Sequence, residues 1–240
     1  MNAPETVPVA LPFCVVLDIS VGSIRLIAAD RFDAEVEVRP GDAAESRDVR
    51  AAQRVLISNG GGVLRVDGEP AGHRVLGIDP GSVAVTVWLP LGSRVEAKAA
   101  VADFRGIGSL GDVTYEGAVG SVQLEEIASG RLAMQDGGIT VGRLGGSAEL
   151  STQRGDIAVA EATRGTVTLR TQSGQITVGA VGGVSATLDA GAPNGRIHNS
   201  LQNSAGAEAE LRIHATTADG DVTARSLEQP SAAVPADAGH

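Results

Sequence analysis

The six residues from Gly106 to Gly111 have the spacing of a dinucleotide-binding loop, because they read Gly-Ile-Gly-Ser-Leu-Gly. In such a loop the glycines let the backbone approach a pyrophosphate, and the N-terminus of the following helix holds the phosphate charge. The next residues, Asp112-Val113-Thr114-Tyr115, favour a strand instead of a helix. We therefore expect no nucleotide site in this stretch.

Three aspartates could form a calcium-binding ladder, because carboxylates stacked one above another can bind a hard cation. Asp103, Asp156 and Asp221 occupy the same place in a sequence repeat. Other units of the repeat interrupt this ladder by placing different residues there, namely Ser121, Gly138, Gln175 and Arg196. We interpret the three aspartates as solvated turn residues.

Arg154-Gly155-Asp156 spells the tripeptide that integrins recognise. Its glycine is the one that the repeat requires, and the place of Asp156 varies between units. The tripeptide is therefore interpreted as a product of the repeat.

Two histidines could be metal ligands, His198 and His214. Each follows an apolar residue that we expect to face inward, Ile197 or Ile213, so each imidazole should point outward. The two lie on strands that face different sides, and a zinc site would need further Cys or His ligands. We therefore predict no catalytic, cofactor-binding or metal site.

The elements that must position these residues follow a repeat of glycine, any residue, then Ile or Val. The apolar residue recurs at positions 104, 122, 139, 157, 176, 197 and 222, with Phe104 first and Ala102 in the glycine place. A period of about 20 residues indicates a solenoid, in which each unit buries its apolar face against its neighbours. Propeller blades have longer periods, of about 40 residues.

Each repeat unit contains two short strands with a bend between them. Ile157 is followed by Val159, Ala162, Val167 and Leu169, and residues two apart face the same side of a strand. The glycine turns the corner at positive φ, as expected for Gly174. Six residues should be buried and two threonines exposed: Ile157, Val159, Val167, Leu169, Ile176 and Val178, against Thr168 and Thr177.

The predicted fold is an all-β, single-stranded parallel β-helix of about 18-residue coils, with a β-rich N-terminal cap. Residues 1–12 are expected to be a flexible tail and 228–240 a disordered one. Residues 13–95 are a cap or degenerate coils, and 96–227 are regular coils. A loop with one helical turn is expected over 40–54, and the strongest single strand over 83–89.

Composition excludes several partners. The chain has 240 residues, a net charge of −10 and one lysine, Lys98, which argues against nucleic acid. It has no apolar run long enough for a membrane span. The apolar stretch over 7–17 contains Pro8 and Pro12 and follows no basic residue, unlike a secretory signal. The one cysteine, Cys14, fits a reducing compartment, so we expect a cytoplasmic protein.

Several of these elements together resemble a bacterial β-strand-repeat family of unknown function, whose members are called putative adhesins. The resemblance covers about residues 13–227 and is closest to members of actinobacterial type. Its most specific part is the turn Leu89-Pro90-Leu91-Gly92-Ser93, and the other parts are 16–19, 22–26, 36–40 and the glycine repeats. It implies a right-handed β-helix, the hand that parallel crossovers favour, and no known chemistry.

Three classes of function remain open. A noncatalytic interaction or structural protein is the class that we favour, with another protein or a further copy as partner. A carbohydrate-active β-helix enzyme would need clustered carboxylates and usually aromatic side chains, and the chain has five aromatic residues. A self-assembling cytoplasmic scaffold would stack end to end through strand edges.

Overall fold

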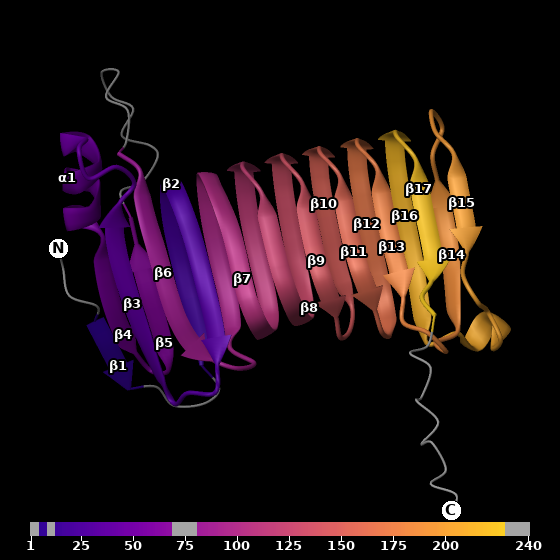
Figure 1. The fold of residues 1–240 in the computed structure, drawn as a ribbon, viewed down its shortest axis with the longest axis horizontal. Coiled ribbons are helices and arrows are strands. Elements are labelled where there is room, and N and C mark those ends of the chain that lie inside the picture. Colours follow the sequence, from indigo (N-terminus) through magenta and orange to yellow (C-terminus); the bar gives the residue numbers. More distant parts are fainter. Residues whose placement is uncertain (1–4, 9–12, 69–80, 229–240) are drawn as a thin grey trace, which may run out of the picture.

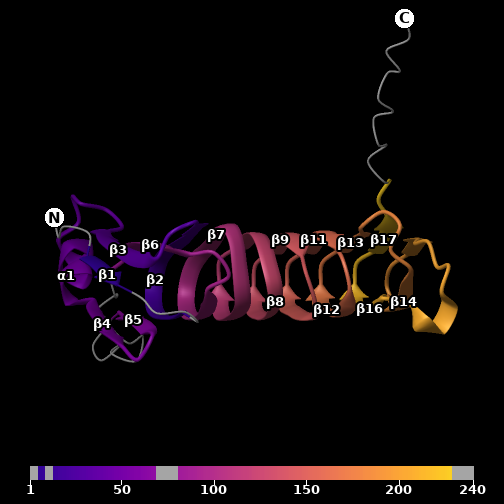
Figure 2. The same cartoon turned by 90° about the horizontal axis from the view of Figure 1, so that it is seen from below.

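A computed structural model describes residues 5–8, 13–68 and 81–228 of the protein (Figure 1). Seventeen strands form one sheet, which confirms the all-β prediction. The strands run across the long axis of an elongated body, and Figure 2 shows them in two layers. This long stack of strands is that of a β-solenoid.

Parallel strands make up the central coils. They are β7 Arg94–Val119, β8 Val122–Asp136, β9 Ile139–Leu144, β10 Ala148–Arg154, β11 Ile157–Ala162, β12 Gly165–Ser173 and β13 Ile176–Ala180. The first apolar residue of each unit pairs with that of the next, in the order Phe104, Val122, Ile139, Ile157 and Ile176. Each coil therefore satisfies its main-chain groups on its neighbours.

The core is a thin layer of mostly aliphatic side chains between the two layers of strands, with Phe13, Phe104 and Tyr115 also buried in it. All six residues predicted to be buried have exposed fractions of 0–1 %, which confirms that prediction. Thr168 and Thr177 are half-buried instead of exposed. Thr168 lies between Glu149 and His214 of the adjacent strands, and a strand only about 4.8 Å away screens an outward side chain.

At the C-terminal end the last coil lies inside the stack. Strands β16 (Leu211–Asp219) and β17 (Val222–Ser226) pair with β12 and β13 on one side. On their other side they pair with β14 (Ala186–Gly191) and β15 (Ile197–Ser200). Along the stack Ile176 is thus followed by Val222 and then by Ile197. The prediction that the coils stack in sequence order is wrong here.

The physical reason lies in the apolar content of the competing strands. Val222 and Ala224 of β17 are fully buried, whereas Ile197 is the one aliphatic residue of β15 and is 46 % exposed. Ile197 lies directly opposite buried Val222, so it is on the core side as predicted, but no described strand covers it at the end of the stack. A strand with two aliphatic residues buries more apolar area when both of its edges are covered.

The first long strand also lies inside the stack. Strand β2 (Cys14–Ala29) pairs in parallel with β7 on one side, and with β5 (Val63–Asp67) and β6 (Val83–Pro90) on the other. Residues 13–95 therefore contain one true coil as well as a cap.

The cap consists of antiparallel strands and one helix. Strand β3 (Asp33–Pro40) pairs with β6 and with β1 (Glu5–Pro8), and β4 (Leu56–Gly60) forms a hairpin with β5. Residues 5–8 are thus a strand where the sequence predicts a flexible tail. The predictions for 1–4, 9–12 and 229–240 fall outside the described residues.

Helix α1 (Ser46–Arg54) replaces the single helical turn predicted from the sequence. Its Asp48 is buried and accepts hydrogen bonds from the main-chain N–H groups of Asp42 and Ser82, both at 3.0 Å. Gly81 has no Cβ to overlap the helix backbone at Arg47. This carboxylate therefore fastens the helix to the start of β6.

Among the described helices, none is long and apolar enough to span a bilayer.

Candidate functional site

The corners of the coils are columns of glycine in direct contact. Gly120, Gly137, Gly155, Gly174 and Gly220 have φ between +138° and +153°. A Cβ on Gly174 would overlap the carbonyl oxygen of Gly155, and the same contact recurs along the column. These five corners therefore require glycine both for the backbone angle and for the space.

The three candidate calcium ligands bind the backbone of the neighbouring coil. Asp156 Oδ1 accepts a hydrogen bond of 2.7 Å from Gln175 N, and Asp221 Oδ1 one of 2.8 Å from Arg196 N. Asp103 Oδ1 accepts two from Ser121, 3.1 Å from N and 2.6 Å from Oγ. These carboxylates are spaced along the stack, and each joins two coils.

No metal centre is assembled in the parts of the chain that the structure describes. A group of three or more His, Cys, Asp or Glu residues that could hold an ion does not occur there.

The integrin-like tripeptide is also part of the corner. Arg154 Nη2 lies 2.8 Å from Asp136 Oδ2 of the preceding coil, while Asp156 binds Gln175 of the following one. Gly155 is the corner glycine between them. The three residues thus contact three different partners within the stack.

The glycine motif over 106–111 lies within β7, with a further strand after it, as the sequence predicts. Its register against β8 shifts between Gly106 and Ser109, which is a β-bulge. Gly108 has φ of +79° and its N–H donates a 2.9 Å hydrogen bond to Glu125 Oε2. The motif bends the strand, and no helix N-terminus follows it to hold a phosphate.

The two histidines lie on different strands. His214 of β16 has its Nδ1 3.3 Å from Asp189 Oδ2 of β14, and its neighbour Ile213 is buried as predicted. His198 lies on β15 and is exposed.

The sequence analysis does not predict the hydrogen bonds of one turn, although the residues of this turn carry the family resemblance described above. In the turn from β6 to β7, Ser93 is buried and its hydroxyl donates a 2.6 Å hydrogen bond to the Pro90 carbonyl. Gly92 adopts φ of +72°, and Leu91 N donates to the Ala29 carbonyl. This turn joins the cap to the first regular coil.

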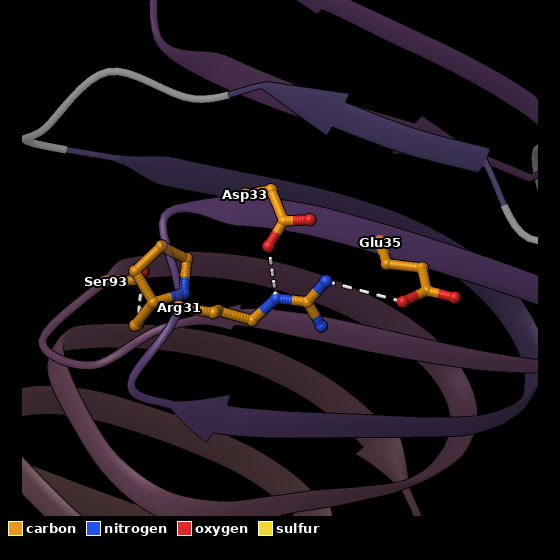
Figure 3. Close-up of polar contacts among 5 residues, drawn as sticks. Arg31, Asp33, Glu35 and Ser93 are labelled. Carbon is orange, nitrogen blue, oxygen red and sulfur yellow. Dashed lines mark hydrogen bonds and ion pairs between the residues drawn. The ribbon is translucent and has the colours of Figure 1, made fainter.

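A second polar cluster lies at the preceding corner (Figure 3). Arg31 Nε donates to Asp33 Oδ1 at 2.7 Å, and Nη2 to Glu35 Oε2 at 3.4 Å. The hydrogen bond from Arg31 lowers the pKa of the Asp33 carboxyl. Between these charges, Phe32 is 82 % exposed. The pairing holds the β2–β3 turn.

Tyr115 is buried and its ring stacks on Phe104 with centroids 4.7 Å apart. Its hydroxyl has no hydrogen-bond partner among the described residues. Burial, and then the charge of Asp103, raise the pKa of this phenol to about 12. A phenol in this state is protonated at neutral pH and is a poor general base.

Cys14 is half-buried. Burial, and then the charge of Glu96, raise the pKa of its thiol. The thiol therefore holds little of the reactive thiolate at neutral pH.

Shallow hollows lie on the strand faces of the described residues. One, of about 390 Å³, lies over β7, β8, β10 and β12 and includes Thr114, Arg131, Glu149 and Thr168. An ion pair of 3.1 Å joins Arg131 and Glu149 across it. This hollow has a strand-ladder floor and contains no aromatic side chain of the kind on which a sugar ring stacks.

The fold and these contacts define a class of protein, a β-solenoid whose polar corner residues join successive coils. The sequence places the chain more narrowly. A family model, Toastrack DUF4097, matches residues 35–225, so the protein belongs to this family, whose function is unknown.

Solved structures of bacterial proteins are similar to the chain. A putative adhesin from Bacteroides fragilis shares 14 % identity over 94 % of this chain and 96 % of its own, with a TM-score of 0.52. A putative cell adhesion protein from Clostridium sporogenes shares 11 % identity over 94 % and 99 %, with a TM-score of 0.41. At 14 % identity, the Bacteroides fragilis structure shows a likeness of fold alone. No curated protein matches the chain in sequence.

Proposed function

We propose that the protein is a noncatalytic β-solenoid that binds another protein through a flat face of its coils. The observation that supports this proposal most is that the candidate ligand residues already serve as contacts between coils. Asp103, Asp156 and Asp221 each hold the backbone of a neighbouring coil. The name of the Bacteroides fragilis structure, a putative adhesin, agrees with a binding role.

Of the two layers of strands, the one that contains β9, β11, β13 and β17 is the better candidate for the binding face. Its outward residues in register are Thr140, Ala158, Thr177 and Thr223. The parallel row two residues further on is small over β9, β11 and β13, where it contains Gly142, Ala160 and Gly179, and it ends at Arg225 of β17. A rigid face of short side chains loses little side-chain entropy when a partner covers it.

Two finer features belong to the same proposal. We propose a right-handed coil of about 18 residues, which agrees with the strong preference of parallel crossovers for that hand. We also propose that the protein works in the cytoplasm of an actinobacterial-type host. The single cysteine agrees with a reducing compartment.

Affinity capture from the host after mild cross-linking tests the proposal, with soluble and membrane fractions analysed separately. Thr177→Arg places a long charged side chain on the proposed face. Thr168→Arg is the matched control, because Thr168 is also half-buried but lies in strand β12 of the other layer. One partner that Thr177→Arg loses and Thr168→Arg retains supports the face. Equal capture by both variants contradicts it.

A further inference from the structure

Strand β15 is an open edge at the C-terminal end of the stack (Figure 1). It pairs with β17, and its four residues, Ile197, His198, Asn199 and Ser200, are all exposed. The stack ends at β15 because β16 and β17, which come later in the sequence, lie further inside it.

Half of the main-chain groups of β15 point away from the protein. Val222 N donates to the carbonyl of Arg196, so the groups of Arg196 face β17. Alternate residues of a strand direct these groups to opposite edges. The N–H and C=O groups of Ile197 and Asn199 therefore point outward, and no hydrogen bond joins them to a described residue.

The neighbouring edge strand β14 is partly covered. Ala186 N donates to the carbonyl of Gln202 at 2.9 Å. The Ser185 hydroxyl contacts Asn203 and accepts a hydrogen bond from Ala205 N. The loop after β15 thus closes the start of β14 and leaves β15 uncovered.

Natural edge strands usually carry charge, proline or a bulge that prevents pairing with another chain. The sequence Ile-His-Asn-Ser of β15 has no Lys, Asp, Glu or Pro, in a chain with a net charge of −10. Ile197 adds an aliphatic side chain that is 46 % exposed. The edge therefore lacks the usual protection.

We propose that β15 pairs antiparallel with β15 of a second copy, about a two-fold axis through His198. Ile197 then lies opposite Asn199 of the second copy, and each such pair exchanges two main-chain hydrogen bonds. Arg196 lies opposite Ser200, so no arginine meets a second arginine. The outward groups of both edges are satisfied together, which closes the assembly at two copies through this surface.

This inference rests on the proposed function, because it names a self-association surface of an interaction protein. A four-residue strand buries less area than a standard interface of about 1,600 Å². We therefore expect a weak dimer that forms as the concentration rises.

Sedimentation velocity over a concentration series tests the edge with two substitutions of one residue. Asn199→Pro removes an outward N–H and costs no hydrogen bond to β17, so the fold should persist and the dimer should be lost. Asn199→Ala keeps that N–H and should dimerise like the wild type. A wild-type chain that stays monomeric throughout, or an Asn199→Pro chain that dimerises equally, overturns the proposal.

Disulfide trapping tests the register in a Cys14→Ser background. Across the proposed axis His198 faces its own copy as a non-hydrogen-bonded pair with Cα atoms about 4.5 Å apart, within disulfide range. His198→Cys should form a covalent dimer under mild oxidation. Thr223→Cys, the matched control one strand inward, should not. Equal trapping of both variants, or none of His198→Cys, overturns the proposed pairing.

The two proposals can fail separately. An Asn199→Pro chain that is monomeric and still captures the host partner leaves the flat-face proposal intact. Loss of host capture by Thr177→Arg with an unchanged dimer leaves the edge proposal intact.

Discussion

At the scale of single residues, the corner glycine has the least freedom to change. Gly174 has φ of +153°, and a Cβ there would overlap the Gly155 carbonyl oxygen. The sequence predicts this corner well, because the glycine requirement is local. It does not predict the half-burial of Thr177, which depends on the strands on either side.

Replacement of Gly174 by Val should therefore destabilise the protein by about 3 kcal/mol, through backbone strain and overlap. Thr177→Val, three residues away at a half-buried strand position, should change the free energy of unfolding by less than about 1 kcal/mol. Urea unfolding followed by circular dichroism measures both. Equal losses for the two variants contradict the corner assignment.

The buried hydroxyl of Tyr115 leads to a prediction of the opposite sign. It has no hydrogen-bond partner among the described residues, and a buried polar group without a partner costs about 1–3 kcal/mol. Tyr115→Phe keeps the ring stacked on Phe104 and removes that cost, so the variant should be as stable as the wild type or more stable. A loss above about 1 kcal/mol in urea unfolding contradicts an unpartnered hydroxyl.

Titration of the same residue reports its burial, and Tyr115 is the single tyrosine of the chain. Its pKa is raised from 10.0 to about 12 in the folded protein. Its contribution to stability is therefore complete below pH 10 and is lost as the pH rises through about 12. Tyrosinate absorbance should show a midpoint near 12 in native protein and near 10 in urea. A native midpoint near 10 contradicts burial.

At the scale of elements, the corner aspartates connect coils whose strands are already paired. The sequence shows that they recur at one place, but it does not show their partners. Each bond depends on a distance of 2.6–3.1 Å between coils, which only the stacked backbone determines.

Asp156→Ala should lose about 1 kcal/mol of stability, because the Gln175 N–H loses its carboxylate acceptor. Asp156→Asn keeps an oxygen at that position and should lose less. Thermal unfolding of the two variants, with and without millimolar calcium, separates this role from ion binding. A calcium-induced rise in the melting temperature of the wild type that is absent from Asp156→Ala would contradict a purely structural role for this carboxylate.

The order of the strands is the part of the fold that the sequence could not supply. The repeat predicts that Ile157 stacks on Ile176, and the structure confirms it. Ile197 and Val222 match the same pattern, so local spacing does not decide which of them follows Ile176. That choice depends on how much apolar area each strand buries between two neighbours, which is a property of the assembled stack.

At the scale of the whole molecule, the long strands nearest the two ends of the chain lie within the stack. Strand β2 is covered by β6 and β7, and β17 by β13 and β15. Terminal strands usually fray unless they are tied into a sheet, so this arrangement should protect both strands from fraying. The sequence predicts a β-rich chain, but it contains no information about its partner.

Hydrogen exchange measured by mass spectrometry tests this arrangement most directly, in dilute protein where β15 is not paired with a second copy. The amides of β17 over 222–226 should exchange much more slowly than those of β15 over 197–200, because β17 is covered on both edges. Rapid exchange over 222–226 together with protection over 197–200 would contradict the account, since it is the pattern of a solenoid stacked in sequence order.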